Sequence, residues 1–457
     1  MSEDNERYRD DPEYQAWVEK KLSRRQLLKR AGLGGAALAG GSLIGAPGAW
    51  GRIQGAVPDS REAELADVGK RINQILKPHG PKGKGINFNI GAVLALTGTG
   101  SFYGDTMSKG TNLAVKHIKA AGGPNFRVTY KDHKSGNPEA GATATRELGI
   151  AKISAVLASY LADFGAMLPG LAQYKMLALD GGGGTGLAFQ GKPYFWGTRA
   201  LTPSDTYIGN YRYVKKHLPN AKRVVFLIWD AGAAFINTEK PVLQKRLTAA
   251  GLDLVGVEPV PIGATNYSNV IARLRSLKPD IIQCAIWGTD PGYFMRGYVN
   301  SGLNAQVIGS EFTPDAAKIA GSAYNKYWFG FDYFDAKNPP NPFSKLFVNE
   351  YRKEYGKDPF FYAADFYENT FSFWDLIRRV LAKKGNIKSG TDLQNALVAN
   401  PTFKSVYSGD KKTVGTYTLN KKTHSTRRRQ MGLFEVKNGT PRPLAFYNIG
   451  GTNYREP

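Results

Sequence analysis

From residue 86 onward, apolar runs of strand length alternate with amphipathic stretches of helix length. This periodicity predicts strands over 86–94, 126–131, 153–159, 176–180, 222–228, 253–260, 280–286 and 305–309. It predicts helices over 104–121, 137–149, 235–250, 266–277 and 290–301. Nearly continuous apolar strands that alternate with helices form parallel sheets covered on both faces, so the pattern predicts an α/β fold.

The number of predicted strand–helix units exceeds what one open sheet holds comfortably. Pro203 interrupts the alternation after the fourth strand, at a natural boundary between two sheets. We therefore expect two doubly wound αβα lobes. Ligands of such folds bind outside the carboxyl ends of the strands, and here that place is the cleft between the lobes.

Composition narrows the function classes. Lys and Arg outnumber Asp and Glu by 61 to 38, but they are spread along the chain, and the one tight run is 427–429. Without a nucleic-acid motif, this indicates a solvated basic surface and no nucleic-acid partner. The single cysteine, Cys284, lies in the apolar run 281-IIQCAIW-287 and predicts a buried, unreactive thiol. The five histidines show no metal-ligand or nucleophile–base spacing, so we expect no metal, no cofactor and no enzyme.

A glycine cluster, 179-LDGGGGTGLAFQGKP-193, contains the dinucleotide-binding pattern G-x-G-x-x-G. A dinucleotide site needs a helix directly after the glycines, because the pyrophosphate binds at the helix N-terminus. Gly191 and Pro193 break any helix that starts there. The cluster therefore predicts a bare loop at the end of the fourth strand and no nicotinamide cofactor.

The N-terminal region has the features of an export signal. Arg24 and Arg25 lie in 23-SRRQLLK-29, and a weakly apolar Ala/Gly-rich segment follows over 31–49. The combination resembles a Tat signal peptide; the alternative is a chance Arg-Arg pair. It implies recognition by the Tat translocon and a soluble periplasmic protein that lacks a lipid anchor. Residues 50–85 are expected to form an extension and linker, and 447–457 a tail.

Three stretches in order carry a family resemblance: 90-IGAVLALTGTGSFYGDTMSKGTNLAVKHIKAAGG-123, 130-YKDHKSGNPEAGATATREL-148 and 265-TNYSNVIARLRSLKPDIIQCAIWGTD-290. The chain resembles type I periplasmic solute-binding proteins, in particular the branched-chain amino-acid and amide-binding group. The resemblance implies a three-segment hinge, ligand capture by lobe closure, and delivery to the permease and ATPase subunits of an ABC transporter. It implies a first lobe of 86–202 and 313–414 and a second lobe of 203–312 and 415–446, with crossings near 200–205, 309–314 and 413–420.

In the first lobe, the resemblance implies ligand contacts after the first, third and fourth strands. The candidates are Ser101, Phe102, Tyr103, Ser159, Leu161, Asp163, Gly182, Gly183, Gly184 and Thr185. For the first three, the alternative is a plain turn with one packed aromatic. Asp163 has the alternative role of a helix cap. The glycines stand where relatives carry a threonine-containing stretch, and their N–H groups are expected to bind a ligand carboxylate. The alternative is a flexible surface loop.

In the second lobe, the implied contacts are Phe235, Trp287, Thr289 and Glu311. Trp287 would cover an apolar part of the ligand or pack in the core. Glu311 stands where amino-acid-binding relatives place the acceptor of the ligand's ammonium group; a solvent-facing hinge residue is the alternative. The expected ligand is a branched-chain or other amino acid. An amide, a urea-like compound or an aromatic acid remains open, as does a role as ligand sensor for a signalling partner.

Overall fold

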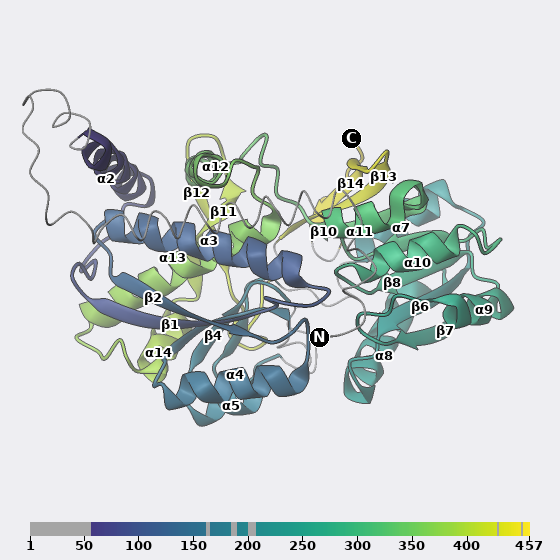
Figure 1. The fold of residues 1–457 in the computed structure, drawn as a ribbon, viewed down its shortest axis with the longest axis horizontal. Coiled ribbons are helices and arrows are strands. Elements are labelled where there is room, and N and C mark those ends of the chain that lie inside the picture. The colour runs from purple at the N-terminus through teal and green to yellow at the C-terminus, as the bar shows by residue number, and fades with distance from the viewer. Residues whose placement is uncertain (1–55, 161–164, 184–189, 200–206, 427–428, 449–450) are drawn as a thin grey trace, which may run out of the picture. The chain divides into compact units, whose positions relative to one another are not determined.

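The computed structural model describes residues 56–160, 165–183, 190–199, 207–426, 429–448 and 451–457. The described residues form a five-stranded sheet, a seven-stranded sheet and a two-stranded hairpin (Figure 1). Helices separate most of the strands along the chain. The α/β fold with two parallel-sheet halves, predicted from the hydrophobic pattern, is confirmed.

The first sheet is parallel throughout, in the order β2-β1-β3-β4-β5. Its strands are β1 (Asn87–Leu94), β2 (Asn125–Asp132), β3 (Ala155–Ala158), β4 (Leu177–Asp180) and β5 (Phe195–Gly197). The strand order reverses between β1 and β3. In a doubly wound sheet, this is where the loops at the carboxyl ends part and leave room for a ligand.

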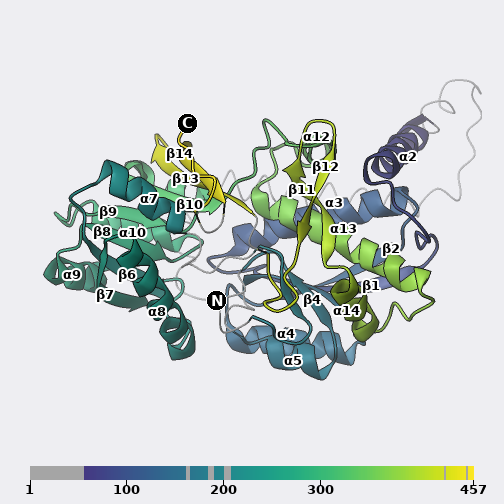
Figure 2. The ribbon, with the colours of Figure 1, turned by 180° about the vertical axis from the view of Figure 1, so that it is seen from behind.

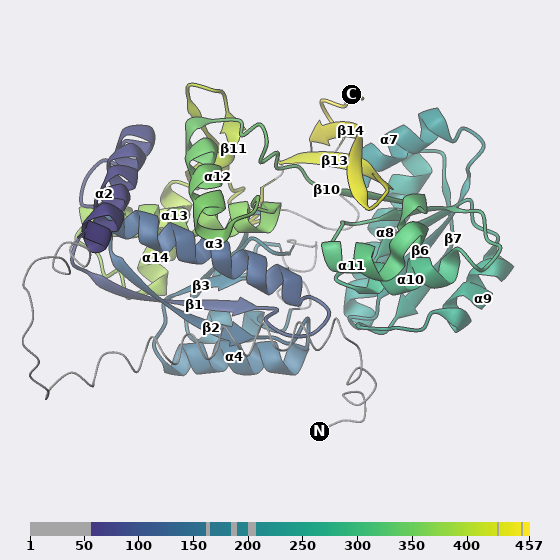
Figure 3. The ribbon, with the colours of Figure 1, turned by 45° about the horizontal axis from the view of Figure 1, so that its top comes forward.

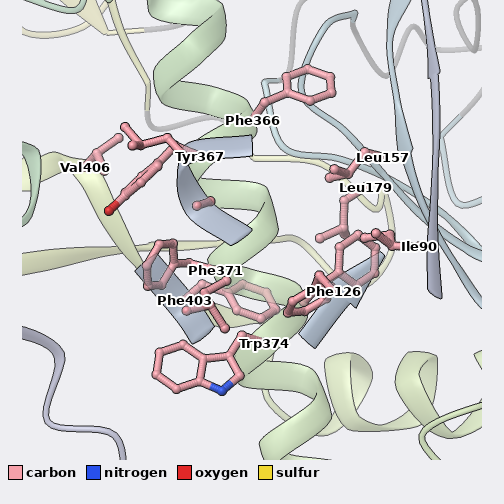
Figure 4. Packing of buried hydrophobic residues seen from close by; sticks show 14 of the residues in the cluster. Ile90, Phe126, Leu157, Leu179, Phe366, Tyr367, Phe371, Trp374, Phe403 and Val406 are labelled. Carbon is pink, nitrogen blue, oxygen red and sulfur yellow. The ribbon is translucent and has the colours of Figure 1, made fainter. Parts of the chain in front are cut away.

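Helices cover both faces of this sheet. Helices α3 (Ser101–Ala120) and α13 (Phe361–Ala382) lie on one face, and α4 (Pro138–Ile150) and α5 (Leu168–Gln173) lie on the other (Figure 1). Buried residues of β1 alternate accordingly: Leu94 packs with the α3 and α13 side, and Val93 with the α4 and α5 side. Figure 4 shows the packing around α13, with Phe366 on the side of Leu157 and Leu179 and Tyr367 on the side of Val406.

The later part of the chain completes this lobe. It adds α12 (Pro342–Tyr355), α14 (Gly390–Ala399), and the hairpin of β11 (Thr402–Gly409) and β12 (Val414–Thr418). The hairpin contacts α12 and α13, as Figure 2 also shows.

Helix α2 (Ala56–Leu76) corrects the expectation for the N-terminal extension. Val68 and Ile72 are buried in the same core cluster as α3 and α13. Gly69 lies against the backbone of Ala120, where a β-carbon would come within 2.1 Å of the carbonyl oxygen. Residues 62–76 are therefore a packed part of this lobe, because their apolar face buries surface that a free linker would expose.

The second sheet has the order β14-β13-β10-β9-β8-β6-β7. Its parallel strands are β6 (Arg223–Trp229), β7 (Asp253–Val260), β8 (Ile281–Ala285), β9 (Gln306–Gly309) and β10 (Tyr327–Asp332). The antiparallel strands β13 (Gln430–Lys437) and β14 (Thr440–Asn448) extend it beside β10 (Figure 3). The helices that accompany it are α7 (Ile208–His217), α8 (Ala233–Ala249), α9 (Ser268–Leu277), α10 (Asp290–Tyr298), α11 (Pro314–Ala320) and the 3₁₀ helix η4 (Gly321–Lys326).

The strand pairing moves two of the expected lobe boundaries. Residues 314–332 were expected in the first lobe, but β10 pairs with β9 and α11 packs on α10. Residues 415–419 were expected in the second lobe, but β12 pairs with β11, and Tyr417 is buried in the first core. The chain therefore passes between the sheets after β10 and again between Ser425 and β13. The expected crossing at 200–205 lies outside the described residues. The first lobe therefore comprises the described residues of 62–199 and 333–426, and the second lobe those of 207–332 and 429–457.

Two further expectations concern single features. Cys284 is fully buried in β8, and burial raises the pKa of its thiol, as expected for an unreactive cysteine. In the described part of the chain, no helix is long and apolar enough to cross a membrane.

Candidate functional site

The loops at the carboxyl ends of β1 and β8 bring the two lobes into contact. Thr99, after β1, places its hydroxyl 2.7 Å from the hydroxyl of Thr289, after β8. The Thr99 hydroxyl donates to Asp290 Oδ1 over 2.9 Å and accepts from the Thr289 N–H over 3.0 Å. The sequence-predicted Thr289 therefore lies at the junction of the lobes, and its partner Thr99 was not among the predicted residues.

Tyr103 makes the second contact between the lobes. The expected helix at 104–121 begins earlier, at Ser101, so Ser101 and Phe102 lie in its first turn. Ser101 is exposed, and Phe102 packs edge-on against Phe360, with ring centroids 5.3 Å apart. Tyr103 is buried; its hydroxyl accepts from the Gly288 N–H over 2.6 Å and donates to Glu311. Of the three predicted residues, Tyr103 is the one that reaches the second lobe.

Glu311, in the loop after β9, is only 2% exposed, so the alternative of a solvent-facing hinge residue is wrong. Its carboxylate accepts from the hydroxyls of Tyr103 and Tyr362, the latter over 3.1 Å from the start of α13. Burial raises the pKa of Glu311, and the nearby Arg199 opposes that shift. The donors to this carboxylate are neutral phenols, so its negative charge lacks an ion-pair partner among the described residues.

The glycine loop does not provide the donors expected from the sequence. The N–H groups of Gly182 and Gly183 each donate to Asp180 Oδ1 over 2.8 Å. The expected anion-binding nest therefore holds the chain's own carboxylate, in a local turn that aspartate forms with the amides after it. Asp180 is fully buried, and burial raises its pKa to about 7 against these two N–H groups. Its Oδ2 has no hydrogen-bond partner in the described part of the chain.

Ser159 is buried at the end of β3, and its hydroxyl lies 2.6 Å from His133 Nε2. His133 Nδ1 accepts from the Gly136 N–H over 3.0 Å, so the proton of the neutral ring is on Nε2. Burial lowers the pKa of His133 to about 4, which keeps the ring neutral. With Nε2 protonated, His133 donates to Ser159 and has no lone pair with which to deprotonate it. This pair therefore lacks the geometry of an activated nucleophile.

Aromatic rings line the junction between the lobes. In the first lobe, Tyr160 lies next to Tyr103, with centroids 5.9 Å apart. Tyr160 also lies 6.4 Å from Trp229 of the second lobe, and Trp229 lies 5.1 Å from Trp287. The Trp229 indole N–H donates to Asp290 over 2.8 Å, and burial raises the pKa of Asp290 to about 6. The predicted Trp287 is half-buried and lies in this aromatic row.

We refer to Asp180, Asp290 and Glu311 as the cleft carboxylates. A second group of buried charges, here the hinge cluster, lies where the chain passes between the lobes and comprises Arg199, Asp332, Asp365, Glu368 and Arg429. Its side chains are at most 5% exposed.

In the hinge cluster, cations and carboxylates pair directly. Arg199 Nε donates to Asp332 over 3.1 Å, and the guanidinium stacks on the rings of Phe361 and Tyr362. Arg429 lies 2.8 Å from Asp365 and 3.0 Å from Glu368. Arg429 was expected on a solvated basic surface. The structure corrects this, because two acidic residues of α13 compensate its charge inside the protein.

Several predicted site residues lie outside the described residues, namely Leu161, Asp163, Gly184, Thr185, Arg24 and Arg25, and so does the side chain of Phe235. Sequence reasoning missed Thr99, Tyr160, Arg199 and Tyr362. Thr99 could have been predicted from its position in 97-TGTGSFYG-104, because it lies in the same loop as the predicted contacts Ser101, Phe102 and Tyr103.

Comparisons with known proteins agree with this architecture. The model of the periplasmic binding protein family matches residues 87–441. Leu/Ile/Val-binding protein homolog 1 of Brucella abortus (strain 2308) is 24% identical over 248 residues, which are 51% of this chain and 64% of that protein. The match thus spans slightly less than two thirds of that relative.

Solved structures share the fold. The branched-chain amino acid transporter substrate-binding protein LivJ of Streptococcus pneumoniae, in complex with isoleucine, superposes with a TM-score of 0.63 at 20% identity, over 79% of this chain and 99% of that one. An ABC transporter solute-binding protein of R. palustris, in complex with benzoate, gives a TM-score of 0.64 at 18% identity, over 79% and 96% of the two chains.

Proposed function

The chain belongs to the periplasmic binding protein family, whose model spans residues 87–441, and we propose that it is the extracytoplasmic solute receptor of an ABC importer. In this proposal, a small organic molecule binds between the lobes and stabilises their closed arrangement, because it contacts both lobes only when they meet. A permease and an ATPase at the inner membrane then take up the released solute.

The observation that carries the proposal is the set of contacts between the strand ends of the two lobes. Thr99 of the first lobe binds Thr289 and Asp290 of the second. Tyr103 of the first lobe binds Gly288 and donates to Glu311. Doubly wound folds bind their ligands in these loops. Here the loops of the two lobes contact each other through buried polar groups. That arrangement supports capture between the lobes.

Two kinds of solute follow from the relatives, since one binds isoleucine and another benzoate. Our sequence prediction of an amino acid rests on Glu311 as the acceptor for its ammonium group. The burial of Glu311 and its two neutral donors support that half of the prediction. The prediction that the Gly182 and Gly183 amides bind the carboxylate of the amino acid loses support, because both amides donate to Asp180.

A thermal-shift screen of the purified chain against amino acids, amides, amines and aromatic acids tests the receptor function. A solute that binds the folded state raises the melting temperature in a concentration-dependent way. If no solute of any class raises it, the receptor function is rejected.

A variant that holds the lobes apart tests capture by closure. A β-carbon at Gly288 would come within 2.4 Å of the Thr99 carbonyl oxygen of the opposite lobe. Gly288→Ala should weaken solute binding by roughly tenfold, which is within the usual cost of a steric overlap. Gly302→Ala is the matched control, because Gly302 has a similar positive φ and open space around it. Equal affinities in the two variants would contradict closure.

Export by the Tat route is part of the proposal and has its own test. Replacing Arg24 and Arg25 with lysine should leave the precursor in the cytoplasm, whereas Arg30→Lys should not. Cell fractionation measures how each variant is distributed between cytoplasm and periplasm. If the double variant is found in the periplasm, the Tat signal is rejected.

A further inference from the structure

We propose that the solute taken by this cleft is an organic cation, an amine or quaternary ammonium with an apolar or aromatic body and no carboxylate. This inference rests on the proposed receptor function and names the chemical class of its solute. It differs from both an amino acid and an aromatic acid in the absence of a negative group.

The cleft carboxylates accept hydrogen bonds from uncharged groups. Glu311 accepts from two tyrosine hydroxyls. Asp290 accepts from the Thr99 hydroxyl, the Trp229 indole and the Gly263 N–H, and Asp180 accepts from two backbone amides. All of these donors are neutral. Arg199 acts on Glu311 and Asp180 without forming an ion pair with either. Buried carboxylates that lack a direct ion pair are costly, and a bound cation would lower that cost.

Two basic side chains of the first lobe, Arg199 and His133, lie near the cleft carboxylates or their neighbours. Arg199 is the cation next to Glu311, but it pairs with Asp332 and donates to the Gly182 carbonyl and the Tyr362 hydroxyl. His133 is neutral. Among the described residues, these two basic side chains are therefore paired or neutral and are not available to a carboxylate solute.

The described part of the glycine loop has no free amide at the positions expected to bind a ligand carboxylate. The expected donors, the Gly182 and Gly183 amides, already bind Asp180. A second carboxylate there would stand beside a buried one, and like charges so close disfavour ionisation of both. The same position is unfavourable for the carboxylate of isoleucine and for that of benzoate.

Aromatic rings adjoin the carboxylates at the junction of the lobes. Tyr160, which lies next to Tyr103, contacts Trp229 of the second lobe. Tyr103 lies next to Tyr362, and Trp229 next to Trp287; the centroids of these neighbours are 5.1 to 6.4 Å apart. The faces of such rings attract cations, and quaternary ammonium groups are bound by aromatic cages of this composition. Carboxylates and aromatic faces together favour a cation that has apolar substituents.

The test compares four probes built on one ring: benzyltrimethylammonium, benzylamine, benzyl alcohol and benzoate, with isoleucine as a fifth. Isothermal titration calorimetry with the full chain measures each affinity. The two cations should bind at least about tenfold more tightly than the alcohol, the range of a hydrogen bond or contact to a charged group. Benzoate and isoleucine should bind more weakly than the alcohol.

Two neutralising variants locate the effect. Glu311→Gln and Asp290→Asn should each weaken cation binding by about tenfold. Glu147→Gln, at an exposed glutamate that pairs with Lys131, is the matched control and should leave it unchanged. Circular dichroism melting of each variant confirms that it is folded.

The outcomes separate this inference from the receptor function. Tighter binding of benzoate or isoleucine than of the cations would overturn the inference and leave the receptor function intact. Equal binding of benzyl alcohol and the cations would also overturn it. If no probe and no member of the solute screen binds, both the inference and the receptor function fail.

Discussion

The hinge cluster and the cleft carboxylates are both buried, but their charges are compensated in different ways. In the hinge cluster, Arg199 pairs with Asp332, and Arg429 pairs with Asp365 and Glu368. In the cleft, hydroxyl, indole and amide donors surround the carboxylates. Each acid of the hinge cluster thus has a direct cation partner, although three carboxylates face two guanidinium groups. The cleft carboxylates have no direct ion pair among the described residues, and this is the difference on which the proposed cation solute rests.

The largest effect is expected at the hinge cluster. Arg429→Met removes the partner of two buried carboxylates, so the free energy of unfolding should fall by about 3–5 kcal/mol. Urea unfolding measures the loss. Arg442→Met, at an exposed arginine of β14, is the control and should cost little. A loss below about 1 kcal/mol for Arg429→Met would mean that the cluster does not depend on this ion pair.

The next effect concerns the loop that positions Asp180. A β-carbon at Gly182 would come within 2.7 Å of Met107 Cε and 2.8 Å of Ser159 Cβ. Gly182→Ala should therefore reduce the free energy of unfolding by about 1–3 kcal/mol, as overpacking usually does. An unchanged melting temperature would show that Met107 and the Ser159 side chain move aside without cost.

Thr99→Val tests the contact between the lobes at Asp290. The variant keeps the shape but loses the hydroxyl that bonds to Thr289 and Asp290. Solute affinity should fall by roughly fivefold, or about 1 kcal/mol, while stability changes little. Thr97→Val is the control, because the Thr97 hydroxyl bonds to Asp132 within the first lobe. A similar loss of affinity in both variants would show that the loop, not the contact between lobes, is responsible.

Much of the fold followed from hydrophobic periodicity, because the parallel strands are continuous apolar runs. The prediction of a strand at 222–228 corresponds to β6 (Arg223–Trp229), and that at 253–260 to β7. Strand β10 was missed, since 327-YWFGFD-332 has neither a continuous aliphatic run nor a clean polar alternation. That omission displaced the lobe boundary, because β10 decides to which sheet residues 314–332 belong.

The site was less predictable, because its defining contacts join residues far apart in the chain. Arg199 and Asp332 are separated by 133 positions, and no local pattern links them. The acceptor of the Gly182 and Gly183 amides, in contrast, is close to them in the sequence. Asp180 directly precedes the glycines, and an aspartate at the start of a turn commonly bonds to the amides that follow. That signal was present in the sequence and could have identified the acceptor.

The pH dependence of the Asp180→Asn variant tests whether Asp180 is charged in the folded protein. Burial raises the pKa of Asp180 to about 7, against opposing contributions from the Gly183 and Gly182 N–H groups and from Arg199. A raised folded-state pKa means that the folded protein holds this proton more tightly than the unfolded chain. The stability that Asp180 contributes is therefore greatest at low pH and is lost as the pH rises toward and through about 7.

Asparagine keeps an acceptor for both glycine amides but does not titrate. The difference between the two proteins should therefore be smallest near pH 5, where Asp180 is already protonated. As the pH rises to 8, the melting temperature of the wild type should fall relative to that of Asp180→Asn. Asp392→Asn, in the first turn of α14, is the control for the substitution itself. Parallel curves for the wild type and Asp180→Asn would mean that Asp180 does not titrate in this range, and would contradict its raised pKa.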